Sequence, residues 1–372
     1  MPNHLDLVAL SLLWTEGAMR KPGHRPAPSD EGAPCVSAAA ARDLVNLDQV
    51  LEALGVADAL ARAAELRRRA ARAMADAAGR GIGLVLRGDP DYPDRLAFVP
   101  DPPPALWTRG TLDSCALAVA IVGSRTATPH GLEVAFRLGE GLARAGLLVV
   151  SGLARGVDAA AHRGALRGGG RTVAVLGCGV DVTYPPEHAS LATEIAASGA
   201  VVSEFAPGIP PRGWHFPRRN RIISGVSMGV VIVEASHHSG SLITARCALE
   251  QGRSVMAVPG GVLSGRNRGA HGLLRDGARV VEDARDVIEE LELDWCQKRA
   301  PEKGPGPFSA LPQEPVLRAM EAGESYGLEE LCEHTGLNPV ELLARLARLE
   351  LSGWVQRIEG GQFVKAGGNV LR

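Results

Sequence analysis

Residues 117–152 read LAVAIVGSRTATPHGLEVAFRLGEGLARAGLLVVSG, and this stretch decides the fold. It holds two continuously apolar runs, 117–122 and 147–150, on either side of an amphipathic segment at 131–145. Apolar runs without alternation are typical of strands that are covered on both faces, as in a parallel sheet. The stretch therefore predicts a strand, a helix and a second strand parallel to the first.

The same alternation continues to residue 281. Further strands are predicted at 172–176, 200–203, 230–234, 254–258 and 279–281, and further helices at 158–167, 187–198 and 242–251. Strands and helices that alternate in this way indicate an α/β fold with an extended Rossmann-like, doubly wound parallel sheet. We assign this domain to residues 81–297.

The residues before the sheet predict helices. Apolar residues recur at helical spacing over 5–14 and 38–78, and a loop rich in proline and glycine separates them at 20–34. A short strand is predicted at 82–86. We therefore expect a helical N-terminal domain at 1–80.

The C-terminal residues predict a second small domain. A linker at 298–307, rich in proline, glycine and charge, precedes residues 308–372. Helices are predicted there at 315–322, 327–335 and 338–351, followed by hairpin strands at 355–358 and 362–364. This order is typical of a winged helix. The domain has 6 basic and 9 acidic residues and would repel phosphates, so we expect an interaction module rather than a DNA reader.

Charge is distributed unevenly along the chain. The net charge is −2, but residues 115–281 carry 17 Lys and Arg against 10 Asp and Glu, whereas residues 282–372 carry 10 against 17. A basic region in an otherwise acidic protein indicates an anionic partner. The six cysteines include no CxxC pair, which argues against a structural zinc site or a disulfide framework and is consistent with a cytoplasmic protein. The sequence has no apolar run long enough to cross a membrane.

Small and basic residues follow several predicted strands. In an open parallel sheet, ligands bind at the carboxyl ends of the strands, where helix N-termini also favour phosphate. The candidate DNA-binding residues at these ends are Gly123, Ser124, Arg125, Ser151, Gly152 and Arg155. Alternatively, the glycines simply close tight turns between strands and helices.

Residues 212–221 read RGWHFPRRNR and combine arginines with aromatic residues. Cations that follow a sugar–phosphate backbone and aromatic faces that stack on bases are typical of single-strand binding. The candidates here are Arg212, Phe216, Arg218, Arg219, Asn220 and Arg221. Alternatively, the segment is a solvated charge run with its aromatic rings in the core. At least one of the arginines is a candidate ion-pair partner of Glu204 or Glu234.

Residues 239–245, SGSLITA, predict a helix start that carries hydroxyl groups. Ser239, Gly240, Ser241 and Thr244 are candidates to bind phosphate oxygens, although an ordinary helix N-cap is also consistent with this pattern. The chain has no GxxxxGK[ST], GxSxG or HExxH motif, so a P-loop ATPase is excluded at the motif level. We predict no cofactor and no metal.

Together these segments resemble the DNA-processing protein A (DprA/Smf) family. The resemblance covers residues 82–292 and is carried by 122–125 (VGSR), 151–158 (SGLARGVD), 216–225 (FPRRNRIISG), 239–245 (SGSLITA) and 258–260 (VPG). It implies a non-enzymatic Rossmann-like protein that binds single-stranded DNA, homodimerises and loads RecA recombinase onto the strand in natural transformation. It also implies that Arg125 is the arginine of the DNA pocket. The N-terminal domain would be a degenerate relative of the SAM or helix-hairpin-helix type, because the expected glycine signature is not visible.

An enzyme on a similar fold is the alternative. The lysine-decarboxylase-like phosphoribohydrolases also have a Rossmann-like sheet and a Pro-Gly-Gly segment, which occurs here at 259–261. That group continues with glycine and threonine and uses a glutamate from a helix. Here VLSGR follows instead, at 262–266, which favours the DNA-binding interpretation.

Overall fold

The computed structural model describes residues 4–15, 47–53, 55–293, 314–321, 324–351, 354–358 and 361–365. The predicted loop at 20–34 and the predicted linker at 298–307 lie outside these residues. The chain divides into two compact units, one formed mostly by residues up to 298 and the other mostly by residues from 299 onward. Each unit is described by itself.

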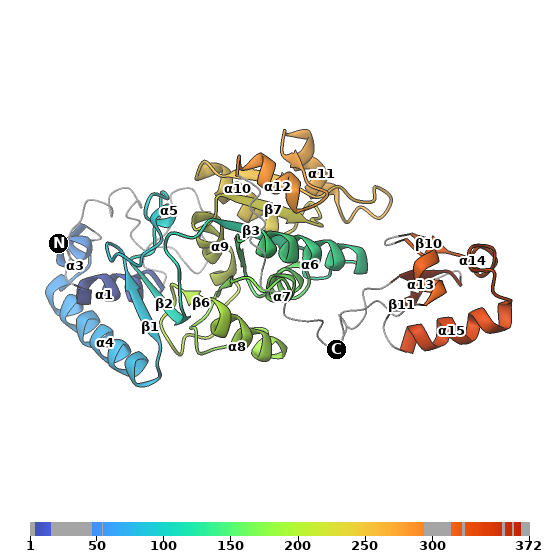
Figure 1. The fold of residues 1–372 in the computed structure, drawn as a ribbon. Coiled ribbons are helices and arrows are strands. Elements are labelled where there is room, and N and C mark those ends of the chain that lie inside the picture. The colour runs from blue at the N-terminus through green and yellow to red at the C-terminus, as the bar shows by residue number, and fades with distance from the viewer. Residues whose placement is uncertain are drawn as a thin grey trace. The chain divides into compact units, whose positions relative to one another are not determined.

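In the described part of the first unit, one sheet has nine strands in the order β1-β2-β6-β5-β4-β3-β7-β8-β9 (Figure 1). The strands are β1 (Gly83–Leu86), β2 (Ala105–Gly110), β3 (Ala118–Gly123), β4 (Leu148–Ser151), β5 (Thr172–Val175), β6 (Ala200–Ser203), β7 (Gly229–Val233), β8 (Ser254–Ala257) and β9 (Arg279–Val280). The seven strands β3 to β9 pair in parallel. The predicted parallel α/β sheet is therefore confirmed.

One edge of the sheet is antiparallel, which the sequence analysis did not predict. β2 pairs antiparallel with β6 on one side and with β1 on the other. Its apolar run, Ala105 to Trp107, is only three residues long before Thr108 and Arg109, so it is shorter than a typical strand. The strand is nevertheless well buried, with Trp107 fully inaccessible, because the partner strands and the N-terminal helices cover it.

The helices cover both faces of the sheet (Figure 1). They are α5 (Asp94–Ala97), α6 (Pro129–Arg144), α7 (Val157–Arg167), η1 (Pro186–His188), α8 (Ala189–Ser198), α9 (His215–Gly225), α10 (Ser241–Glu250), α11 (Arg268–Arg275) and α12 (Ala284–Glu290). α7 and α8 pack on one face, with α6 beside α7 and α12 beside α6. α5, α9, α10 and α11 pack on the other. The direction of winding reverses at β3, so β3 and β7 border the topological switch point, where open α/β sheets bind ligands.

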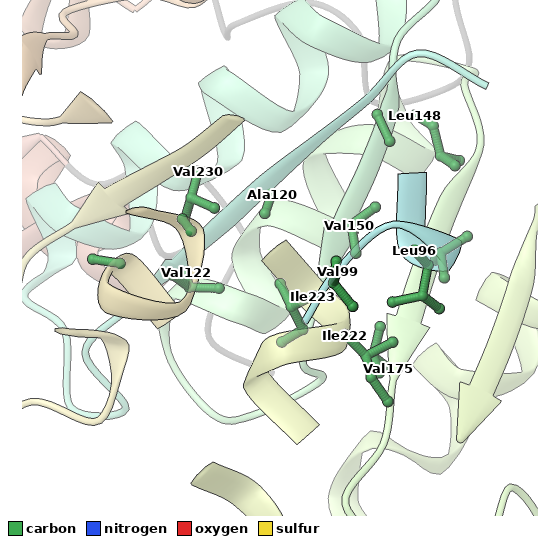
Figure 2. Packing of buried hydrophobic residues seen from close by; sticks show 14 of the residues in the cluster. Leu96, Val99, Ala120, Val122, Leu148, Val150, Val175, Ile222, Ile223 and Val230 are labelled. Atoms are coloured by element: carbon green, nitrogen blue, oxygen red, sulfur yellow. The ribbon is translucent and has the colours of Figure 1, made fainter. Parts of the chain in front are cut away.

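Helix α9 is anchored by a buried apolar face. Ile222 and Ile223 pack into the same core as Val150 and Val175 of the sheet, and Leu96 of α5 closes the cluster (Figure 2). Burying such side chains stabilises the fold by about 1.5–3 kcal/mol each. This packing fixes the orientation of α9, and with it the positions of the arginines on its first turns.

The N-terminal helices lie against the β1–β2 edge of the sheet. They are α1 (His4–Thr15), α3 (Leu47–Ala53) and α4 (Ala59–Gly79), which confirms the predicted helices within the described residues. Leu66 of α4 shares a core with Trp107, although the predicted domain boundary at residue 80 lies between them. No helix in the described residues is long and apolar enough to cross a membrane.

The second unit has the predicted order of three helices and a hairpin. Its elements are α13 (Pro315–Ala319), β10 (Ser325–Tyr326), α14 (Leu328–Thr335), α15 (Pro339–Leu351), β11 (Val355–Arg357) and β12 (Phe363–Lys365). The short strand β10 was not predicted, and it pairs with β12 at the edge of a sheet ordered β10-β12-β11. The second unit has a hydrophobic core formed by its own residues, among them Leu331, Leu346 and Val355.

Candidate functional site

A pocket of about 440 Å³ lies where β3 and β7 end, at the switch point of the sheet. It is lined by residues from the loops after β3, β4, β7 and β8 and from the starts of α7, α9 and α10: Val122, Gly123, Ser124, Arg125, Thr126, Ala154, Asp158, Phe216, Pro217, Arg219, Asn220, Ile223, Glu234, Ser236, Ser239, Gly240, Ser241, Ile243, Thr244 and Arg266. Ten of these are among the sixteen candidates from the sequence.

The loop after β3 begins at a position that only glycine can occupy. A Cβ atom on Gly123 would overlap the carbonyl oxygen of Val233 and lie 2.7 Å from Cγ2 of Val157. The strand can therefore approach both β7 and α7 closely. The carbonyl oxygen of Ser124 then accepts a hydrogen bond from the backbone N–H of Val157 at 3.2 Å, and Arg125 projects at the exposed rim.

Arg125 and the first turn of α9 lie together at the rim. The guanidinium carbon of Arg125 is 5.3 Å from the centroid of the Phe216 ring, which is a cation–π geometry. The same ring lies 5.5 Å from the ring of Tyr184, a half-exposed side chain on the loop after β5. Arg125, in the loop after β3, and Phe216, in the arginine–aromatic segment at 212–221, are 91 residues apart in sequence. The fold brings them together on one surface.

Arg219 belongs to the interior of the site. Its side chain is buried, and its Nη1 donates hydrogen bonds to the carbonyl oxygens of Gly152, at 2.8 Å, and Val175. Burial lowers the pKa of Arg219 to about 10, whereas burial raises the pKa of Asp158, whose negative charge faces the guanidinium. A Cβ on Gly152 would lie 2.5 Å from Nη2 of Arg219, so glycine is needed here to make room for the guanidinium. Arg219 is mainly a structural cross-link between the strand ends.

The hydroxyl-rich loop before α10 forms another wall. The Oγ atoms of Ser239 and Ser241 are 2.7 Å apart, and Nδ2 of Asn220 donates to the carbonyl oxygen of Gly240 at 3.3 Å. Thr244 lines the pocket one turn further along the helix. All five residues were predicted as site candidates, and the structure brings them to one pocket.

Three charged residues of the pocket were not among the candidates: Asp158, described above, Glu234 and Arg266. Glu234 has a left-handed backbone (φ 52°), and its side chain is only 5% exposed. Arg266, 51% exposed in the loop after β8, donates from Nη1 to the carbonyl oxygen of Thr126 at 3.0 Å and lies 3.9 Å from Oε1 of Glu234. Arg266 follows the strand predicted at 254–258, and this position could have marked it as a candidate. The segment at 262–266 was instead interpreted only as a difference from the phosphoribohydrolase motif.

Three of the candidate arginines are held in ion pairs outside the pocket, and two of them share one carboxylate. Oε2 of Glu204 accepts hydrogen bonds from Nε of Arg218 at 3.2 Å and from Nη2 of Arg221 at 2.7 Å. Asp101 also pairs with Arg221, 3.1 Å from its Nε. The expected ion pair with Glu204 is therefore confirmed. Arg221 is buried, so the structure corrects its place among the strand-binding candidates, because a phosphate cannot reach it.

The remaining candidates also lie outside the pocket lining, as does Gly152, described above with Arg219. Ser151 is fully buried and donates from Oγ to the carbonyl oxygen of Ile121 at 2.6 Å, which makes it a link between β4 and β3. Arg155 is exposed and pairs with Glu187, with 2.5 Å between Nε and Oε1. Arg212 is exposed at the residues preceding α9. Of these three, Ser151 offers no surface to a ligand.

The charges of the lining leave the pocket weakly positive. Arg125, Arg219 and Arg266 are opposed by Asp158 and Glu234. The two exposed arginines stand at the rim, whereas both carboxylates are buried. Within the described part of the chain, no three His, Cys, Asp or Glu side chains are placed to hold a metal ion. The arrangement can bind an anionic chain at its rim.

Comparison with known families identifies both units. A family model described as "DNA recombination-mediator protein A" matches residues 83–292, and one described as "DprA winged helix domain" matches residues 300–361. Protein Smf of Escherichia coli K12 is 40% identical over 277 residues, which cover 73% of this chain and 74% of the relative. DNA processing protein DprA of Streptococcus pneumoniae is 44% identical over 206 residues, covering 55% and 73%.

Two solved structures have the same fold. The X-ray structure of DNA processing protein A from Streptococcus pneumoniae has a TM-score of 0.62 at 33% identity and covers 78% of this chain and 94% of that chain. DNA processing protein A from Helicobacter pylori, solved for its single-stranded DNA binding mode, has a TM-score of 0.51 at 29% identity, covering 58% and 97%. The predicted α/β core agrees with these structures, and the predicted winged helix agrees with the family match over residues 300–361.

Proposed function

Because the chain belongs to the DNA recombination-mediator protein A family, we propose that it binds single-stranded DNA at the pocket between the ends of β3 and β7. The observation that carries this proposal is the exposed guanidinium of Arg125 lying over the Phe216 ring at the rim. A cation beside an aromatic face serves the two parts of an unpaired nucleotide, its phosphate and its base. The Helicobacter pylori relative, named for single-stranded DNA binding, supports this assignment.

We assign different tasks to different residues from their contacts. Arg125 and Arg266 are exposed near each other, since Arg266 bonds to the carbonyl oxygen of the residue after Arg125, and both are available to phosphates. The hydroxyls of Ser239 and Ser241 add neutral donors to the lining of the same pocket. Phosphate contacts of this kind position a strand without selecting its sequence.

We assign the site no catalytic role. Asp158, a possible general acid by residue type, accepts hydrogen bonds from the backbone N–H groups of Gly152 at 3.1 Å and Ala154 at 3.4 Å and faces Arg219. These contacts make it a structural carboxylate. No contact among the described residues of the pocket supports the phosphoribohydrolase alternative.

The proposal also includes the protein partners of this chain. By family resemblance, the protein acts as a homodimer and loads RecA recombinase onto the strand in natural transformation. The winged helix domain contributes acidic residues, which favour contact with a protein over contact with DNA. Sedimentation equilibrium tests the dimer, and recombinase filament formation on strands coated with single-strand-binding protein tests the loading.

Charge reversal at Arg125 tests the binding site. We expect Arg125→Glu to weaken binding of a labelled oligothymidylate about tenfold or more, because it removes one phosphate partner and adds a repulsive charge. The plot of log affinity against log salt should also become shallower by about one unit of slope. Fluorescence anisotropy at several salt concentrations measures both.

Arg144→Glu is the matched control. Arg144 is exposed at the end of α6, at the opposite edge of the sheet from the pocket, and pairs with Glu140 at 2.6 Å. The same change of charge there should leave binding close to wild type. Equal affinities of the Arg125→Glu variant and the wild type at every salt concentration would remove the pocket from the proposed interface.

A further inference from the structure

Helix α4 has an exposed face that carries arginines. Residues 59–80 include six arginines and two acidic residues. The opposite face of the helix is buried, with Leu66 and Ala70 in the core of the N-terminal helices. This packing fixes the rotation of the helix and leaves Arg68 and Arg72, one turn apart, exposed to solvent on its outer face.

The arginines of this helix differ in their partners. Arg67 forms ion pairs with Asp6 and Asp48, with 2.6 Å between the nitrogen and the oxygen in each, and so links α4 to α1 and α3. No hydrogen bond or ion pair within the described part of the chain holds Arg68 or Arg72. Their guanidinium groups are therefore available to an anion from outside the molecule.

Arg68 and Arg72 begin a row that ends at the sheet. Residues four apart form a ridge along a helix, and this ridge continues through Asp76 to Arg80 over about 18 Å. Asp76 is neutralised by Arg80, 2.7 Å away, and Nη1 of Arg80 lies 2.8 Å from Oδ2 of Asp181. The row therefore runs from two unpaired cations to the loop after β5, which contains Asp181.

The loop after β5 also reaches the rim of the pocket. Tyr184, three residues after Asp181, has its ring 5.5 Å from the ring of Phe216. β5 is parallel to β4, and β4 to β3, so this loop lies at the same edge of the sheet as the pocket. Three residues span at most about 11 Å, so the path from the rim along the row is about 30 Å long. An extended polymer bound at the rim can follow it.

The outer face of α4 suits a phosphate chain. The exposed neighbours of Arg68 and Arg72 on this face are small: Ala64, Ala71 and Ala75. Short side chains let a sugar–phosphate backbone approach both guanidinium groups. The helix has no aromatic residue on which a base could stack, so contacts here would position a strand without selecting its sequence.

Resting on the proposed strand binding, we propose that Arg68 and Arg72 form a second phosphate-binding site, which holds the part of the strand that extends beyond the pocket. An acidic protein surface would also be attracted to these cations. The strand is favoured because its first contact, at the same edge of the sheet, makes the second contact intramolecular. Its effective concentration is then high, and a weak second site adds measurably to affinity.

The test compares two oligothymidylates, one of about 4 nucleotides, which fills only the pocket, and one of about 20 nucleotides, which also reaches α4. The double variant Arg68→Gln with Arg72→Gln should bind the long strand about fivefold more weakly, because two phosphate contacts are lost, and the short strand as wild type does. For the long strand, the plot of log affinity against log salt should become shallower by about 1.4 units of slope. Anisotropy titration and competition measure these affinities.

Arg144→Gln with Arg167→Gln is the matched control. Both arginines are exposed in the last turns of α6 and α7, at the edge of the sheet where the strands begin, and the variant loses the same charge. Both affinities and the salt slope should stay close to wild type. The single variants Arg68→Gln and Arg72→Gln should each lose about half of the effect on a logarithmic scale, which keeps the test available if the double variant fails to fold.

Each outcome decides between the proposals. An unchanged affinity and salt slope for the long strand would overturn the second site and leave an acidic protein surface as the partner of this face. Equal losses for the short and long strands, or the same loss in the control variant, would also overturn it, because the effect would then be one of overall charge. Failure of wild type to bind the long strand would instead overturn the proposed function, and the second site with it.

Discussion

Replacing Arg219 by methionine should destabilise the folded protein by about 3–5 kcal/mol. Arg219 and Asp158 are both buried, with exposed fractions of 3% and 6%. Methionine keeps an unbranched apolar side chain, but it leaves Asp158 without its facing cation and removes a donor from the carbonyl oxygens of Gly152 and Val175. The cost of an uncompensated buried charge dominates this estimate.

A double-mutant cycle tests the cause. Asp158→Asn keeps a carbonyl oxygen that can accept from the Gly152 N–H, and it removes the negative charge. The double variant Asp158→Asn with Arg219→Met therefore lacks both charges, and its loss of stability should be smaller than the sum of the single losses by about 1–3 kcal/mol. Guanidinium chloride unfolding followed by tryptophan fluorescence measures the free energies, since Trp107 is buried in the same unit.

The same variants separate structure from binding. The double variant removes one charge of each sign, so the net charge of the pocket is unchanged and its affinity for oligothymidylate should stay close to wild type. Arg144→Met, at an exposed ion pair, should change stability by less than about 0.5 kcal/mol. A loss below about 1 kcal/mol for Arg219→Met, or strictly additive losses in the cycle, would refute the argument.

Two further predictions concern buried polar groups. Glu204→Gln should lower stability by about 1.5–3 kcal/mol by weakening the charged hydrogen bond to Arg221, without reducing strand binding; an unchanged melting temperature would contradict this. Burial lowers the pKa of His162 from 6.5 to about 3, so only the unfolded chain gains this proton between those pH values. The contribution of His162 to stability is complete above pH 6.5 and falls by about 1.4 kcal/mol per unit as pH decreases toward 3. His162→Asn, which retains a donor toward Oγ1 of Thr172, should show a shallower decline in urea unfolding across this range, and parallel slopes would disprove it.

Local patterns predicted most of the secondary structure. The strand at 200–203 has the predicted bounds, and the other predicted strands of the parallel sheet agree to within two residues. Helix α9 was not predicted as a helix, because its arginines and Pro217 obscure the apolar face formed by Ile222 and Ile223. β2 was missed because a strand with so short an apolar run depends on its pairing with β6, which is a non-local contact.

The amino-acid order by itself determined which residues form strands and helices, and that basic and small residues follow the strands, because periodicity and turn chemistry act over a few neighbouring residues. Only the tertiary structure decided which arginines face a ligand. Arg221 is paired with a carboxylate from a distant segment and Arg219 is bonded to carbonyl oxygens of other strand ends, whereas Arg266 joins the pocket by a hydrogen bond to a residue 140 positions away. Whether a cation is buried in an ion pair or left at a rim depends on the groups that the fold places beside it, and no local pattern contains that information.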